Sequence, residues 1–250
     1  MGQVIITTSW DDGHPCDLRL AELLKRYNIP ATFYIPIDNV ERECMNSSQI
    51  SEIARAFDVG GHSYHHLDLT RIDLKDARKE IIEGKEKLEQ IIGKEVVSFC
   101  YPRGCYNKNI IDLVKGARFN GARTVMLFTR QVKDIYKMGT TIYARNLSIH
   151  SYRKHFRGWQ DPGLFWYILH NNLFFKSWDQ IAIEVLDFIR VNGGIWHLWG
   201  HSWEINENND WNKLEHVLSK VESLSKEMRI VDNSELIKNI YQTKMTSYTP

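Results

Sequence analysis

Three short segments, far apart in the chain, each place carboxylate or imidazole side chains directly after an apolar, strand-like run. They are Ser9-Trp10-Asp11-Asp12-Gly13, His62-Ser63-Tyr64-His65-His66 and Leu198-Trp199-Gly200-His201. Side chains of these types bind divalent metals or transfer protons. Groups that follow parallel strands meet at one edge of an α/β barrel, so we expect a single site built from all three segments.

The predicted metal ligands are Asp12, His62 and His66. One carboxylate and two imidazoles can hold a catalytic divalent ion and leave positions open for water and substrate. The His-x-x-x-His spacing predicts that both rings lie on one side of a helical turn. Gly60 and Gly61 precede the pair, and we expect them to let the backbone turn sharply where the strand ends.

The adjacent carboxylates Asp11 and Asp12 allow a division of roles. Neighbouring residues at a strand end face different directions, so one can bind the ion while the other faces a water molecule. The ion would polarise a carbonyl and lower the pKa of the water, and the second carboxylate would take its proton. The pattern therefore predicts metal-assisted hydrolysis.

These motifs resemble those of a known family. Ser9-Trp10-Asp11-Asp12-Gly13 is similar to the Thr-Phe-Asp-Asp-Gly motif of polysaccharide deacetylases with the NodB homology domain, carbohydrate esterase family 4. The His62–His66 segment resembles that family's His-Ser/Thr-x-x-His motif, and Leu198-Trp199-Gly200-His201 resembles its last motif, Leu-x-x-His. The matching motifs extend over roughly residues 4 to 205.

The resemblance implies a fold and a set of roles. The fold would be an irregular (β/α)7-type barrel, the NodB-like deacetylase fold. Asp11 would be the general base and His201 the general acid that protonates the leaving amine. The ion on Asp12, His62 and His66 would be Zn²⁺, with Co²⁺, Ni²⁺ or Mn²⁺ as alternatives.

Two motifs depart from the family pattern. The third reads Cys100-Tyr101-Pro102-Arg103-Gly104, with Cys100 where relatives often carry an arginine that bonds to the catalytic aspartate. The usual fourth-motif Asp-Trp pair is absent, and Ala122-Arg123-Thr124-Val125 stands in its region. An arginine fork orients a carboxylate and favours its charged form. We therefore predict that Arg123, or alternatively Arg103, orients Asp11.

Residues around these motifs are candidates for substrate binding, and backbone N–H groups near Tyr101 are candidates for holding an oxyanion. Aromatic faces near His201 suit a sugar ring, although core packing explains Trp199 equally well. Glu204 either holds His201 in its working tautomer or is an exposed surface acid. The predicted substrate-binding residues are Tyr101, Pro102, Arg103, Trp199 and Trp203.

Composition bounds the class of protein. The chain has 250 residues, 43% of them hydrophobic, which suits one α/β barrel domain over residues 1–250. Lys plus Arg number 32 against 31 for Asp plus Glu, so a nucleic-acid partner is not indicated.

We expect no membrane span, and the absence of a signal-like start predicts a cytoplasmic protein. Four cysteines without a Cys-x-x-Cys pair indicate free thiols. The oligomeric state is left open.

Apolar runs alternate with amphipathic stretches, which predicts seven or eight βα units. An aromatic-rich insertion at about 151–178 interrupts this alternation, either as an extra helix over a barrel end or as a wall of the ligand pocket. The expected strands are 4–9, 31–35, 57–61, 96–101, 121–125, 142–148, 194–199 and 228–231. The expected helices are 16–28, 47–56, 74–92, 107–117, 179–192, 210–226 and 233–242.

The function predicted is that of a metal-dependent N-deacetylase, a hydrolase of linear amide C–N bonds that acts on an N-acetylated amino sugar. An intracellular glycan precursor, for a surface polysaccharide or O-antigen, is the expected substrate because of the predicted location. One alternative is a related non-sugar amide or ureide hydrolase. Another, from a different class, is a carbohydrate-binding barrel without catalytic activity, which the two altered motifs would explain.

Overall fold

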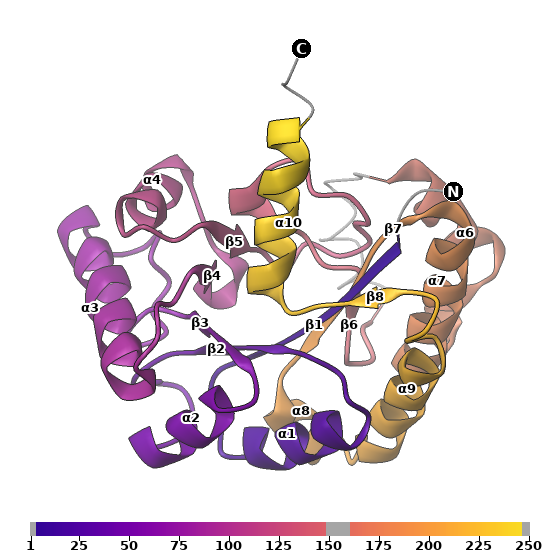
Figure 1. The fold of residues 1–250 in the computed structure, drawn as a ribbon, viewed down its shortest axis with the longest axis horizontal. Helices are drawn as coiled ribbons and strands as arrows, with labels where there is room; N and C mark the ends of the chain where they lie inside the picture. Colours follow the sequence, from indigo (N-terminus) through magenta and orange to yellow (C-terminus); the bar gives the residue numbers. More distant parts are fainter. Residues whose placement is uncertain (1–3, 149–160, 247–250) are drawn as a thin grey trace.

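The computed structural model describes residues 4–148 and 161–246 (Figure 1). Eight strands occur in this part of the chain, and each coincides with one of the eight predicted strands. They are rich in β-branched and aromatic residues, which suit a sheet covered on both faces. Their bounds are β1 Val4–Asp11, β2 Thr32–Ile35, β3 Asp58–Gly61, β4 Ser98–Cys100, β5 Gly121–Arg123, β6 Ile142–Tyr143, β7 Gly194–Gly200 and β8 Arg229–Ile230.

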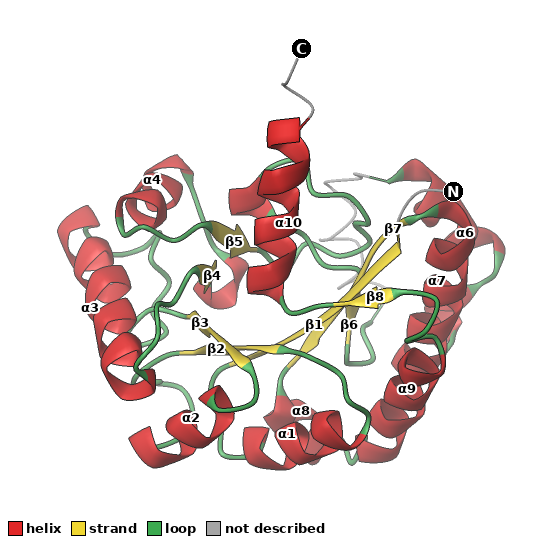
Figure 2. Cartoon of the chain, viewed as in Figure 1, coloured by secondary structure: helices red, strands yellow, loops and turns green. Residues whose placement is uncertain are grey.

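The strands form one parallel sheet in the order β5-β4-β3-β2-β1-β7-β6, with β8 paired to β1. The sheet curls into a half-barrel with helices around its outside (Figures 1 and 2). No pairing joins β5 to β6 within the described residues, so the barrel is open there. The predicted irregular NodB-like barrel is confirmed at this level.

Helices follow most strands, as the alternating pattern predicts. Asn46 illustrates a well-defined start: its side chain accepts the N–H of Gln49 at 3.1 Å, and the Gln49 side chain accepts the N–H of Asn46 at 2.9 Å. The bounds are α1 Asp17–Arg26, α2 Ser47–Ala54, α3 Leu74–Ile92, α4 Lys108–Gly116, α6 Pro162–His170, α7 Trp178–Asn192, α8 Ser202–Glu207, α9 Trp211–Ser223 and α10 Asn233–Thr246, with short 3₁₀ turns η1 Pro102–Gly104, η2 Ile135–Lys137 and η3 Leu173–Phe175.

The predicted insertion at 151–178 is only partly visible. Residues 151–160 lie outside the described residues, and the remainder contains α6 and η3, so an additional helix is present as one alternative predicted. Helix α8, which directly follows His201, was not predicted. None of the helices in the described ranges is long and apolar enough to cross a membrane. The single-domain organisation stays a prediction, which we adopt because all eight strands share one sheet.

Strand register brings the functional segments together. In the β1–β7 pair, Trp10 lies opposite Gly200, so Asp11 and His201 leave the sheet side by side. In the β4–β5 pair, Cys100 lies opposite Arg123. Because all these strands are parallel, the side chains at their carboxyl ends gather at one edge of the half-barrel.

Candidate active site

A cavity of about 360 Å³ opens at this edge of the sheet. It contains both predicted proton-transfer groups and all three predicted metal ligands. Pro102 is buried and does not line it, whereas Arg123 lies fully buried behind Asp11. The lining residues are Asp11, Asp12, His62, His66, Tyr101, Arg103, Val125, Tyr143, Trp199, His201, Trp203 and Glu204.

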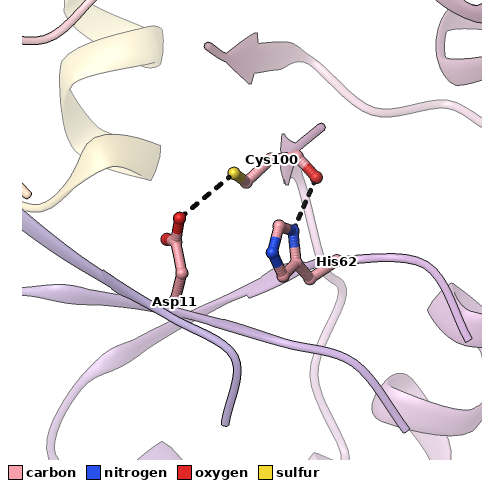
Figure 3. A group of neighbouring side chains, drawn as sticks. All are labelled: Asp11, His62 and Cys100. Atoms are coloured by element: carbon pink, nitrogen blue, oxygen red, sulfur yellow. Dashed lines mark hydrogen bonds between the residues drawn. The ribbon is translucent and has the colours of Figure 1, made fainter. Parts of the chain in front are cut away.

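Asp11, the last residue of β1, is held by two neighbours. Its Oδ1 accepts a hydrogen bond from Arg123 Nη2, and the Cys100 thiol lies 3.6 Å from its Oδ2 (Figure 3). The Arg123 side chain is fully buried, with its guanidinium 5.2 Å from the ring of Tyr34 and 4.9 Å from that of Trp199. Burial opposes the charged form, but Asp11 raises the pKa of Arg123, so the pair is a buried ion pair.

Arg123 therefore occupies the position predicted for the residue that orients Asp11. The alternative, Arg103, points elsewhere and pairs with Glu41 at the mouth of the cavity. The charge that Cys100 cannot supply comes from the end of β5, the strand next to β4. Cys100 contributes its thiol and its backbone carbonyl instead.

Asp12 adopts a left-handed backbone conformation with φ of +80°, which is unusual for a residue other than glycine and typical of functional sites. Its Oδ2 accepts the indole N–H of Trp203 at 2.9 Å. Its Oδ1 is buried and has no hydrogen-bond partner, yet it lies 3.6 Å from His62 Nε2 and 3.3 Å from His66 Nε2. Burial works against ionisation, but the neighbouring imidazoles of His62, His201 and His66 lower the pKa of Asp12.

The histidine segment is an irregular loop rather than the predicted helical turn. Ser63 and His66 have left-handed φ angles of +62° and +58°, and these bring the two histidine rings to a centroid distance of 4.8 Å. Glu80 of α3 supports the loop, since its carboxylate accepts the backbone N–H groups of Tyr64 and His65. His65 also bonds to Glu80 through its ring, at 2.6 Å, and so points away from Asp12.

The two glycines before this loop do not make the sharp turn that we expected. Gly60 and Gly61 continue β3 with ordinary strand geometry. A Cβ on Gly60 would lie 2.3 Å from the ring of Tyr34, and one on Gly61 would lie 2.9 Å from Phe119. Close packing of aromatic rings against the strand therefore explains the glycines.

The remaining nitrogens of the two histidines are also bonded. His62 Nδ1 lies 2.8 Å from the carbonyl oxygen of Cys100, and His66 Nδ1 lies 3.2 Å from Glu41 Oε2. Burial and the charge of His62 lower the pKa of His66 to about 4, which favours the neutral ring that a metal requires. Burial opposes a charge on His62, but Cys100 and the nearby Asp12 carboxylate raise its pKa well above the usual range.

The orphaned Asp12 Oδ1 and the two Nε2 atoms fit a divalent cation. All three donor atoms lie within 4.8 Å of one another, and the set is buried. The ligand atoms of a second set, Asp11, His62 and Cys100, also lie within 4.8 Å of one another (Figure 3). It fits a cation less well, because Arg123 already neutralises Asp11 and a bound cation would lie near its guanidinium.

His201 lies on the opposite side of Asp12. Its Nε2 is 3.7 Å from Asp12 Oδ2, and its Nδ1 is 2.8 Å from Glu204 Oε2. Tyr143 donates its hydroxyl to the same Glu204 oxygen at 2.5 Å, and Arg145 pairs with the other oxygen. Burial disfavours the imidazolium, but Glu204 raises the pKa of His201. Glu204 is 2% exposed, so the alternative of an exposed surface acid is wrong.

The aromatic residues of the site do not present free ring faces on which a sugar could stack. Trp199 is stacked on Tyr143 at a centroid distance of 4.1 Å and an angle of 11°, and it is 5% exposed, so packing accounts for it. Tyr101 is fully buried, and its own N–H donates to the carbonyl of Arg123 at 3.3 Å, so that amide is not available to an oxyanion. Trp203 lines the cavity but directs its N–H to Asp12.

Sequence reasoning missed two residues of the site, Glu41 and Tyr143. Glu41 lies in the loop between β2 and α2, which also contains Asp38 and Glu43, so nothing in the sequence distinguishes it. Tyr143 ends β6, inside a predicted strand that was assigned no function. Its place at a strand end, in line with the other site residues, was the available signal.

Comparison with known proteins agrees with this geometry. The family model described as polysaccharide deacetylase matches residues 2–122, a range that contains Asp11, Asp12, His62 and His66. This part of the chain, just under half of its length, is similar to the polysaccharide deacetylase family. His201 lies beyond the matched range, so its inclusion in the site rests on the structure.

The individual relatives of this chain are distant. The peptidoglycan-N-acetylmuramic acid deacetylase PdaC of Bacillus subtilis is 29% identical over 115 residues, which are 45% of this chain and 24% of PdaC. The chain spans a third or less of the curated relatives it matches.

Solved structures support the fold. A Mycobacterium smegmatis protein named as a polysaccharide deacetylase superimposes with a TM-score of 0.68 at 19% identity, covering 97% of this chain and 92% of that one. A pseudoenzyme of carbohydrate esterase family 4 from Bacillus anthracis superimposes with a TM-score of 0.56 at 14% identity, covering 94% and 66%. Members of one fold thus include a protein described as inactive, so activity has to be argued from the site.

Proposed function

We propose that this chain is a metal-dependent N-deacetylase that hydrolyses the acetamide of an N-acetylated amino sugar. The observation that carries the proposal is the convergence of two flanking proton-transfer groups, Asp11 and His201, on a cation-binding set in one cavity. Deacetylase names among the relatives support the reaction class.

The cation would be held by Asp12, His62 and His66. When bound there it would supply Lewis-acid polarisation of the acetamide carbonyl and of the attacking water. Zn²⁺ is the ion that we favour, because a carboxylate with two imidazole nitrogens is a common catalytic zinc set.

Asp11 is placed to accept the proton of the attacking water. Its ion pair with Arg123 fixes the orientation of the carboxylate, and the Cys100 thiol contacts the second oxygen. A carboxylate that is held in this way loses little freedom when it takes the proton.

His201 is placed to give a proton to the departing nitrogen. Glu204 holds Nδ1, so Nε2 is the nitrogen directed at Asp12 and the cavity. Water adds its oxygen to the acetyl carbon, the C–N bond breaks, and the imidazolium proton goes to the amine. Acetate and a free amino sugar are the products.

The sugar itself and its cellular source stay predictions. An intracellular precursor of a surface polysaccharide or O-antigen, in the cytoplasm, was expected from the sequence, whereas PdaC and another relative are named for peptidoglycan sugars. The cavity has one exposed cation at its mouth, Arg103, among the residues that line it. We include Arg103 in the proposed substrate-binding set.

An acetate-release screen tests the proposal. Purified protein with Zn²⁺ or Co²⁺ is incubated with chitooligosaccharides, peptidoglycan fragments, a UDP-linked acetamido sugar and a ureide. Acetate from at least one sugar, abolished by chelation and by Asp11→Asn, is the expected result. Hydrolysis of the ureide but of none of the sugars would show that the protein is a ureide hydrolase. Sugar binding without turnover with either ion would support the inactive barrel instead.

A further inference from the structure

Each of the three proposed metal ligands has one atom directed at the others and one atom held by a neighbour. His62 is held by a backbone carbonyl, which no side-chain substitution removes. His66 and Asp12 are held by the side chains of Glu41 and Trp203. These two contacts can therefore be tested independently of the ligands.

Glu41 lies in a loop that is fixed relative to the histidines. The N–H of Asp38 donates to the carbonyl of Tyr64 at 2.8 Å, and the N–H of Glu41 donates to the Asn39 side chain at 2.9 Å. Glu41 Oε2 reaches His66 Nδ1 at 3.2 Å, while its Oε1 accepts a bond from Arg103. A carboxylate on Nδ1 places the ring proton there and leaves the lone pair on Nε2.

Trp203 lies in the first turn of α8 and is also held from outside. Its N–H is 2.9 Å from Asp12 Oδ2, and the guanidinium carbon of Arg42 lies 3.3 Å from the centroid of its ring. Arg42 is in turn paired with Glu207 at 3.2 Å. Indole is a neutral donor that cannot bind a metal, so it occupies Oδ2 and leaves Oδ1 for the ion.

We propose that Glu41 and Trp203 are positioning residues for the cation, each of which fixes one ligand in the orientation that the ion requires. The inference rests on the proposed metal site and goes beyond it, because it assigns Trp203 to the cation rather than to a sugar. Consecutive residues of one loop, Glu41 and Arg42, then support two ligands that lie 54 positions apart in the sequence (66 − 12). Loss of such outer contacts typically weakens metal affinity about 10- to 100-fold.

The test measures the Kd of the metal-free protein for Zn²⁺ and for Co²⁺ by competition with a chromophoric chelator. Glu41→Ala and Trp203→Phe are each expected to raise the Kd about 10- to 100-fold. Two matched controls are expected to leave the Kd unchanged: Glu43→Ala removes an exposed acid of the same loop as Glu41, and Trp199→Phe removes an indole N–H that has no partner in the described residues. Circular dichroism and Tm show whether each variant is folded.

The outcomes separate this inference from the proposed function. If the wild type binds one ion and releases acetate but both variants bind that ion as tightly as the wild type, the positioning roles are wrong and the deacetylase proposal stands. If the wild type binds neither ion, both proposals fail together. If the controls weaken binding as much as the two variants do, the effect is a general disturbance of the cavity and the specific roles are also wrong. The visible Co²⁺ spectrum gives a second readout, since a misdirected His66 or Asp12 changes the ligand geometry.

Discussion

Replacing Glu204 with glutamine isolates the proposed acid step. Glu204 is 2% exposed and lies 2.8 Å from His201 Nδ1, with Tyr143 and Arg145 on its carboxylate. Glutamine keeps the size of the side chain and can still accept one hydrogen bond, but it removes the negative charge. The substitution therefore tests the electrostatic effect on His201 with little change of shape.

The size of the effect follows from this contact. A hydrogen bond between charged groups contributes about 1.5–3 kcal/mol. Since about 1.4 kcal/mol is a factor of ten, the amide reaction of Glu204→Gln is expected to slow by roughly 10- to 150-fold. Glu204 raises the pKa of His201, so the imidazolium is present below that pKa and is lost as the pH rises through it. Without Glu204, the alkaline limb of the pH–rate profile moves to lower pH.

The assay compares two substrates of different leaving groups. Hydrolysis of an N-acetyl sugar requires a proton on the departing amine, whereas the aryloxide of an activated aryl acetate departs without one. Glu204→Gln is expected to slow only the first, while Asp11→Asn, which affects attack, slows both. Equal losses on both substrates together with an unmoved alkaline limb would show that Glu204 has only a structural role, and the assignment of His201 as the acid would lose its basis.

Three further predictions concern buried groups near the sheet edge. Arg123→Met leaves Asp11 buried without its partner and should lower the free energy of unfolding, measured in urea, by about 3–5 kcal/mol. Adding Asp11→Asn to this variant should recover part of the loss. If the free-energy changes of the two single variants simply add in the double variant, the two residues are not coupled and the prediction is wrong. Burial and Asp232 raise the pKa of Asp58 to about 6, so its charge destabilises the fold above that pH. Between about pH 4 and pH 6 the wild type should lose about 2 kcal/mol relative to Asp58→Asn, and parallel pH curves would contradict this. Cys100→Ser keeps the backbone carbonyl that bonds His62, so the Kd for Co²⁺ should not change. A thiolate-to-cobalt absorption band in the wild type would show that Cys100 binds the ion and would contradict this prediction.

The sequence carried enough information to predict the fold and the convergence of the three proposed metal ligands. Every strand in the described residues had been predicted, because buried β-branched runs with turn residues between them form a strong local pattern. Asp12, His62 and His66 meet because parallel strands end at the same edge, and that rule needs no knowledge of the loops. Arg123 was predicted for the same reason, from its place at the end of a strand.

The contacts that hold those residues could not be predicted. The left-handed backbone of Asp12 and His66 depends on tertiary packing, and for the histidine pair the sequence pattern favoured a helical turn instead. Glu204 follows His201 by three residues, yet its burial depends on Tyr143 and Arg145 from β6 and the residues after it. Gly60 and Gly61 owe their small size to rings from other segments, which a local interpretation of the sequence cannot see.

The central claim is that one divalent cation binds between Asp12, His62 and His66. Anomalous diffraction at the zinc edge, from crystals of the Zn²⁺-loaded protein, tests it directly. We expect a single peak within about 2.0–2.2 Å of Asp12 Oδ1 and of the Nε2 atoms of both histidines. A protein that takes up no zinc, or a peak bound instead by Asp11 and Cys100, would contradict the account.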